Sequence, residues 1–275
     1  MEFLPIRTDL WCVIPFSHNI HLPWGLRISR VDFSAMGSLF GEICHIFCCP
    51  PRPSHIVAKF AFLPPIPTYT IVQSSGGSEW QIIFKPEVGL ISDYAKSRME
   101  VFYTMTKRKS RIACLYIHYD ATGDPASRIT ILFSHGNAVD IGQMAGFLFS
   151  LSQRFGVNVL VYDYSGYGAS TGQTLEANLY ADGEAALVEL RERYLCPLNR
   201  IVLYGQSIGT APTVELATHY AVAGVVLHSA LMSGLRVVCP GTTRRFCFDP
   251  FNRQASFSDN IYIGLTFGIP FTDCL

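Results

Sequence analysis

The sequence lacks a charge imbalance. Its 21 Lys and Arg residues balance 21 Asp and Glu residues, so the formal net charge at pH 7 is zero. A general nucleic-acid binder would be expected to carry a strongly basic domain, and the composition therefore argues against nucleic acid as a partner. Charged residues make up only 15% of the chain and apolar residues 49%, which leaves ample material for a buried core.

Signals for secretion are also lacking. No Asn-x-Ser/Thr acceptor for glycosylation occurs, and the N-terminus has no basic stretch followed by an apolar one. Residues 1–35 contain no run of about 20 apolar residues that could span a bilayer, and we interpret them as an unstructured leader, with Met36 as an alternative start. The nine cysteines are clustered or scattered rather than arranged as a disulfide framework, so we expect an intracellular protein with reduced thiols.

Residues 36–78 precede the expected folded region. Apolar residues recur at helical spacing over 37–51, and three cysteines lie among them: Cys44, Cys48 and Cys49. Clustered thiols beside apolar residues favour S-palmitoylation of a segment on a membrane surface. A buried helix with inert cysteines and part of a metal site are the alternatives. Recurring prolines then predict an extended linker.

Folded structure is expected to begin near Glu79. Alternating apolar residues predict an antiparallel start to a sheet, with strands over 80–84, 99–104 and 111–119. Short apolar strands then alternate with helical segments. The further predicted strands are 129–133, 157–162, 200–204 and 223–227, and the predicted helices are 141–155, 175–194 and 208–220. This order predicts an α/β fold with a mostly parallel, doubly wound sheet covered on both faces.

One stretch of the chain predicts a catalytic centre. Residues 201–210 read IVLYGQSIGT, in which an apolar run meets Gly-x-Ser-x-Gly and a helix-compatible segment follows. The pattern is typical of a nucleophile elbow, a strand-to-helix turn that presents a serine, here Ser207, at the end of a sheet. Gly205 and Gly209 remove side chains where the strand and the helix must pass close together.

Two backbone N–H groups are expected to form an oxyanion hole beside the predicted nucleophile. Ile208 supplies one because it follows that serine, and the loop after the strand 129–133 supplies the other. In that loop, which reads Ser-His-Gly-Asn-Ala, we choose Asn137 as the donor. The site would then lie at the carboxyl ends of the strands, where open α/β sheets bind their ligands.

Several motifs together resemble one family. They are FSHGNAVD at 133–140, YDYSGYGAS at 162–170, NLYAD at 178–182 and YGQSIGT at 204–210, joined by FCCPP at 47–51 and AFLPP at 61–65. With these motifs the sequence resembles the alpha/beta hydrolase domain-containing protein 17 family. The resemblance runs from about residue 36 to residue 251.

The resemblance implies an alpha/beta-hydrolase fold and a serine hydrolase of the palmitoyl-protein thioesterase type. Such an enzyme removes S-palmitoyl groups from cysteines of membrane-associated proteins through an acyl-serine intermediate. The implied partners are S-palmitoylated membrane proteins and the membrane surface, on the cytoplasmic face of plasma membrane and endosomes. The implied lipid anchor is the cysteine cluster, which here comprises Cys44, Cys48 and Cys49. No metal or organic cofactor is implied.

The sequence departs from this family after Phe251. The family continues with a strand that ends in the triad aspartate and, later, a segment with the triad histidine, whereas residues 252–275 form an atypical tail with neither motif. We therefore expect residues 79–251 to form an incomplete hydrolase domain that lacks its last strands. The strand 223–227 would become an uncovered apolar edge.

Few residues could replace the missing base. Only His219 and His228 follow Ser207 in the sequence; His219 is expected on a helix surface, and His228 at a strand end is the better substitute. His135 belongs to the oxyanion loop and is a weak candidate. No triad aspartate is assigned, because three later aspartates have no base to orient: Asp249, Asp259 and Asp273.

Three functional interpretations stay open. The first is a palmitoyl-protein thioesterase whose chain, as an incomplete or variant form, is poorly active or inactive, because a serine without its base is a weak nucleophile. The second is a catalytically inactive, lipid-anchored variant that binds acylated partners. A weaker alternative is a lipid ester hydrolase.

Overall fold

A computed structural model describes residues 61–74, 77, 79–120, 122–230 and 262–265 of the chain. Every described residue belongs to the unit Pro51–Leu275. The expected leader and the cysteine cluster fall outside the described residues. Among the residues that are described, no helix is both long and apolar enough to cross a bilayer.

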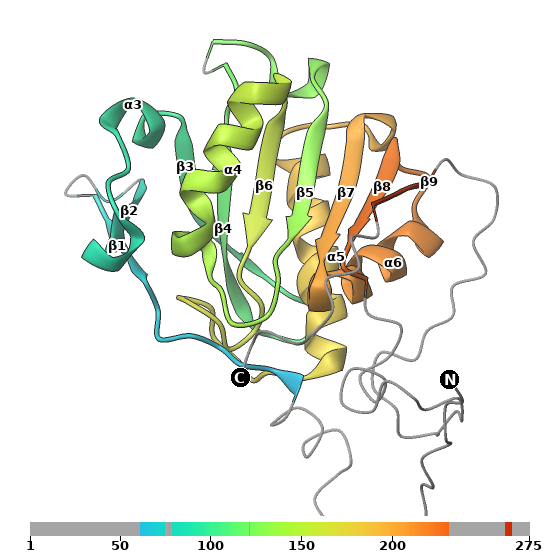
Figure 1. The fold of residues 1–275 in the computed structure, drawn as a ribbon, viewed down its shortest axis with the longest axis horizontal. Coiled ribbons are helices and arrows are strands. Elements are labelled where there is room, and N and C mark those ends of the chain that lie inside the picture. The colour runs from blue at the N-terminus through green and yellow to red at the C-terminus, as the bar shows by residue number, and fades with distance from the viewer. Residues whose placement is uncertain (1–60, 75–76, 78, 121, 231–261, 266–275) are drawn as a thin grey trace, which may run out of the picture. The chain divides into compact units, whose positions relative to one another are not determined.

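A seven-stranded sheet forms the centre of the described part (Figure 1). Its strand order is β3-β4-β6-β5-β7-β8-β9. Pairing is antiparallel between β3 and β4 and between β4 and β6, and parallel across the rest of the sheet. The strands span Met99–Met105 (β3), Arg111–Ile117 (β4), Thr130–Ser134 (β5), Asn158–Tyr162 (β6), Ile201–Gln206 (β7), Gly224–His228 (β8) and Tyr262–Leu265 (β9). The expected antiparallel start and mostly parallel continuation are thus confirmed.

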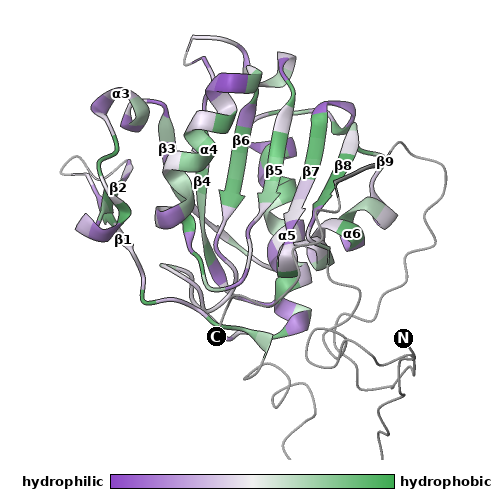
Figure 2. Ribbon diagram, viewed as in Figure 1, coloured by the Kyte–Doolittle hydropathy of each residue, from purple (hydrophilic) through white to green (hydrophobic). Residues whose placement is uncertain are grey.

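Helices cover both faces of this sheet. On one face α4 (Ile141–Phe155) packs against alternate strand residues, which include Leu115, Phe133 and Val161. The opposite face carries α5 (Glu176–Glu192) and α6 (Thr210–His219), which pack on the intervening residues, including Cys114, Leu132 and Leu160. Figure 2 shows that the central strands are predominantly apolar, as a sheet buried on both faces requires. The doubly wound arrangement is therefore confirmed.

The bounds of α4 follow from local chemistry. Asp140 caps its N-terminus in a capping box, in which its side chain accepts from the Gln143 N–H and the Gln143 side chain accepts from the Asp140 N–H. Gly156 ends the helix in the left-handed conformation at φ 65°. The helix spans the residues that the sequence predicts.

The folded unit begins earlier than the boundary expected near residue 79. The strand β1 (Tyr69–Gln73) pairs antiparallel with β2 (Trp80–Phe84) in a separate two-stranded sheet. The segment 61–68 before it is also attached, because Thr68 donates two hydrogen bonds to the buried carboxylate of Asp140. Proline-rich sequence carries no strand periodicity, and these polar contacts span 72 residues, so the pattern concealed them. The short helix α3 (Asp93–Lys96) then leads to β3.

The expectation that residues 223–227 form an uncovered edge is wrong. The strand β9, which lies in the tail that begins at residue 252, pairs parallel with β8. The register places Val225 beside Tyr262 and His228 beside Leu265. These ladder hydrogen bonds satisfy backbone groups of β8 that an edge strand would leave open.

Candidate active site

The predicted nucleophile lies at a strained turn. The strand β7 ends at Gln206, a 3-10 turn spans Ser207–Gly209, and α6 begins at Thr210. Ser207 has φ 51°, in the left-handed region that non-glycine residues rarely occupy. The Thr210 hydroxyl donates to the carbonyl of Ser207 at 2.6 Å and so ties the turn. Strain of this kind persists only where its surroundings enforce it, and it is typical of functional turns.

The two glycines of the turn are sterically required. A Cβ added at Gly205 would lie 2.5 Å from Thr213 Oγ1 and 2.6 Å from the Gly209 carbonyl oxygen, so β7 and α6 meet there. At Gly209, an added Cβ would lie 2.1 Å from the carbonyl oxygen of Ser134. The second glycine therefore lets α6 approach the end of β5 rather than β7 itself.

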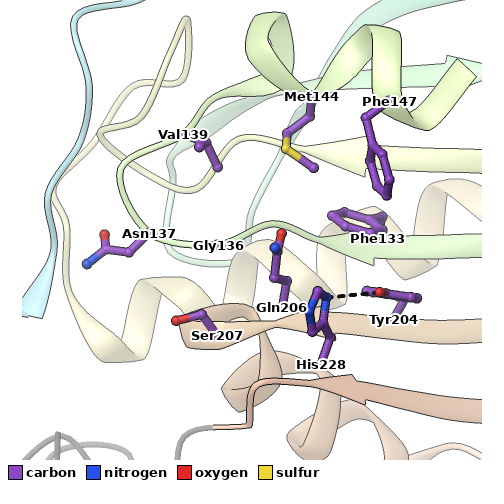
Figure 3. A pocket seen from close by; sticks show the side chains of 10 residues that line it. All are labelled: Phe133, Gly136, Asn137, Val139, Met144, Phe147, Tyr204, Gln206, Ser207 and His228. Carbon is purple, nitrogen blue, oxygen red and sulfur yellow. Dashed lines mark hydrogen bonds between the residues drawn. The ribbon is translucent and has the colours of Figure 1, made fainter. Parts of the chain in front are cut away.

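A pocket of about 440 Å³ opens at this turn (Figure 3). Its lining comes from the carboxyl ends of β5, β7 and β8, the loop after β5, and α4: Phe133, Gly136, Asn137, Val139, Met144, Phe147, Tyr204, Gln206, Ser207 and His228. One side is apolar, because it is formed by Val139, Met144 and Phe147. The volume and mixed lining are those of a small-molecule site.

The two expected oxyanion donors lie beside the serine. Asn137 lines the same pocket, and Ile208 directly follows Ser207 and is buried. The Asn137 side chain points away from Ser207 in Figure 3. Its side-chain amide is hydrogen-bonded to Ala61 and Leu63, so the role expected of Asn137 would fall to its backbone N–H.

The histidine His135 is not placed to act as a base. It is fully buried, and its Nε2 lies 3.2 Å from Asp163 Oδ1. Its Nδ1 lies 2.8 Å from the Gly136 carbonyl oxygen, and its ring packs 4.2 Å from that of Tyr164. The Nε2 atom is near Asp163 but makes no hydrogen bond there, the ring is closed off from solvent, and the residue is not part of the pocket lining.

The two histidines after the nucleophile take different positions. His219 is exposed at the end of α6, where its Nδ1 lies 2.8 Å from the Glu215 carbonyl oxygen. His228 lines the pocket, but its Nδ1 is 3.1 Å from the Tyr204 hydroxyl (Figure 3). Within the described residues, no hydrogen bond joins the Ser207 hydroxyl to a histidine.

Buried carboxylates support the loops around the pocket. Asp163 accepts hydrogen bonds from the Ile141 N–H at 2.9 Å and the Tyr69 hydroxyl at 2.5 Å. Asp182 of α5 accepts from both the backbone N–H and the hydroxyl of Ser165 at 2.7 Å. Burial raises the pKa of Asp163 and raises the pKa of Asp182 to about 7. These groups order loops and do not reach the pocket.

Other residues of the site carried a weaker signal in the sequence. Tyr204 and Gln206 belong to the elbow strand, so their inclusion follows from its alternation. Met144 and Phe147 of α4 were not predicted, because an apolar helix residue gives no sign of whether it faces a core or a cavity. The cysteine cluster and the three late aspartates, Asp249, Asp259 and Asp273, fall outside the described residues.

Comparison with known proteins gives close relatives. The profile of the alpha/beta hydrolase family matches residues 131–270. The chain is 48% identical over 213 residues to alpha/beta hydrolase domain-containing protein 17B from Homo sapiens, which covers 77% of this chain and 73% of that protein. It is 47% identical over 231 residues to alpha/beta hydrolase domain-containing protein 17C from Xenopus tropicalis, in an alignment that covers 78% of this chain and 73% of that protein. A solved structure of an alpha-beta hydrolase from Vibrio vulnificus is similar, with 18% sequence identity and a TM-score of 0.46. The match covers 56% of this chain and 57% of that chain.

The raised pKa of Asp182 predicts a pH dependence of stability. Its native pKa of about 7 lies above the ordinary value of 3.8, so the native state binds the proton more tightly than the unfolded state. The resulting stability is fully present below pH 3.8 and is lost as the pH rises through about 7. Because each pKa unit corresponds to about 1.4 kcal/mol, the loss is on the order of a few kcal/mol.

The measurement is the free energy of unfolding by urea between pH 4 and pH 8, for the wild type and for Asp182→Asn. The variant cannot ionise at this position, so we expect it to lose less stability over this range than the wild type. The difference between the two curves isolates Asp182 from every other titrating group. Parallel curves for the two proteins would contradict the prediction.

Proposed function

Because the chain belongs to the alpha/beta hydrolase family, and within it to the alpha/beta hydrolase domain-containing protein 17 group, we propose that it is a serine hydrolase that cleaves S-palmitoyl thioesters of membrane-associated proteins. The observation that carries the proposal is Ser207, at φ 51° in the elbow, facing a pocket with an apolar side. The serine is the proposed nucleophile, and the apolar side is the proposed site of the acyl chain.

The proposed reaction has two steps. The Ser207 hydroxyl oxygen attacks the thioester carbonyl carbon, the C–S bond breaks, and the cysteine leaves as a thiol with the proton that the serine loses. Water then hydrolyses the acyl-serine ester, which frees the fatty acid and restores the hydroxyl. The backbone N–H groups of Asn137 and Ile208 are the proposed donors to the oxyanion that forms in each step.

A second candidate function is favoured by one observation. In the part of the chain that the structure describes, His228 is hydrogen-bonded to Tyr204 rather than to Ser207. A pocket that accepts an acyl chain without an activated serine would bind acylated proteins and leave them intact. The two candidates differ in the reactivity of the serine.

A fluorophosphonate probe separates these candidates. We expect covalent labelling of the wild-type chain and none of Ser207→Ala, because the probe reacts only with an activated serine. Hydrolysis of a palmitoyl thioester should fall at least about 1,000-fold in the same variant. An unlabelled wild type that still binds a palmitoylated peptide would favour the second candidate.

The apolar side predicts a preference for long acyl chains. Met144→Trp fills part of the pocket, so we expect kcat/KM for a palmitoyl thioester to fall about 10-fold or more while an acetyl thioester is affected less than about threefold. Phe155→Trp is the matched control, because Phe155 ends the same helix, is 69% exposed and does not line the pocket. Equal losses for both substrates would contradict the acyl assignment. The same variants assayed with palmitoyl and acetyl oxygen esters test the lipid ester alternative.

We further propose that the protein is held on the cytoplasmic face of membranes by acylated cysteines. The support is the sequence pattern of Cys44, Cys48 and Cys49, together with the need for more than one acyl chain in stable anchoring. Acyl exchange should detect hydroxylamine-sensitive modification at these three positions. The buried Cys114 and Cys196 serve as internal controls that stay unmodified. Free thiols at all three positions would refute the anchor.

A further inference from the structure

The segment 61–68 is fastened to the loop that follows β5 at both of its ends. At one end, the Asn137 amide donates to the Ala61 carbonyl oxygen at 2.8 Å and accepts from the Leu63 N–H at 3.0 Å. At the other end, Asp140 accepts from the N–H and the hydroxyl of Thr68 at 2.7 and 2.5 Å. Figure 1 shows the segment, in blue, running along the edge where the strands β5, β6 and β7 end.

The Asn137 side chain makes two further contacts. Its Oδ1 also accepts from the Tyr167 hydroxyl at 2.6 Å and from the Ala138 N–H at 3.1 Å. The Tyr167 hydroxyl in turn accepts from the Leu63 N–H at 3.1 Å. The amide oxygen of Asn137 thus accepts three hydrogen bonds, and its amide nitrogen donates one. This side-chain amide points away from Ser207 (Figure 3).

The backbone beside Asn137 is held in an unfavourable conformation. Ala138 has φ 58°, a strained conformation that a non-glycine residue keeps only where its surroundings enforce it. The contact from Ala138 N–H to Asn137 Oδ1 and the fastened segment are such surroundings. The family profile begins at residue 131, so the segment that supplies them lies outside the matched region.

We infer that Asn137 is a positioning residue for the oxyanion hole: its side chain clamps the segment 61–68 to the loop and thereby directs the loop's backbone N–H toward Ser207. This inference rests on the proposed function, since it concerns the same site. The side chain itself does not touch substrate. Its effect on the reaction passes through the orientation of a donor that acts mainly in the transition state.

Kinetics of a soluble short-chain thioester test the inference. Asn137→Ala should lower kcat about 10- to 100-fold and change KM less than about threefold. The reason is that a misdirected oxyanion donor stabilises the transition state less but leaves substrate binding almost unchanged. Tyr167→Phe removes one contact of the same amide and should lower kcat by a smaller factor. A kcat for Asn137→Ala within about twofold of the wild type would overturn the inference.

Asn158→Ala is the matched control. Like the half-buried Asn137, the buried Asn158 has an Oδ1 that accepts a backbone N–H, that of Tyr119 at 3.1 Å, but Asn158 lies at the start of β6, at the opposite end of the sheet. We expect this variant to lose stability and keep kcat within about twofold of the wild type. Equal losses of kcat in the two asparagine variants would reduce the effect to general destabilisation and overturn the inference.

Amide hydrogen exchange gives a readout that needs no turnover. In Asn137→Ala, exchange should accelerate in peptides covering 61–68 and 134–140, and in Asn158→Ala it should not. Unchanged exchange in both regions of Asn137→Ala overturns the clamp even if the chain is inactive. A wild type that fluorophosphonate does not label at Ser207 defeats the proposed function alone, so the two failures are distinguishable.

Discussion

The contact between the start of α6 and the end of β5 is the constraint on which the site depends. A side chain at Gly209 would collide with the Ser134 carbonyl, so only glycine lets the elbow lie against the loop that leaves β5. That contact brings the turn at Ser207 to the loop after β5, so Ser207 and Asn137 line one pocket although 70 residues separate them in the sequence. The proposed nucleophile and the proposed oxyanion loop are thus brought together by a close approach of two backbone segments, and the remaining groups hold this approach in place.

Buried carboxylates provide much of this support. Asp140, Asp163 and Asp182 each accept backbone N–H groups from another part of the chain, and each is fully buried. Hydrogen bonds to a buried carboxylate are strong, and removal of their donors leaves a charge without compensation. The polar network therefore fixes loops whose own sequence would not order them. Burial of these carboxylates disfavours their charged form, and this raises the pKa values of Asp163 and Asp182.

Features encoded by neighbouring residues could be predicted from the sequence. The elbow glycines, the helical period of α4 and the alternation of strands and helices that predicts a parallel sheet each follow from residues that lie close together in the chain. The attachment of residues 61–73 could not, because it depends on Asn137 and Asp140, more than 70 residues away. Nor could β9, since a four-residue strand containing Gly264 has little periodicity and pairs with β8 across a long gap. The apolar side of the pocket was missed because Met144 resembles an ordinary core residue.

The attachment of the segment 61–68 also limits the length of chain between the pocket and the cysteine cluster. Ala61 is bound to the pocket loop, and Cys49 precedes it by only 12 residues. A chain of that length spans at most about 40 Å when fully extended. Under the proposed acylation of Cys49, the pocket would sample only a thin layer next to the membrane. If the proposed thioesterase activity and the proposed anchor both hold, the length of this tether, rather than affinity, would select acylated cysteines close to the lipid surface.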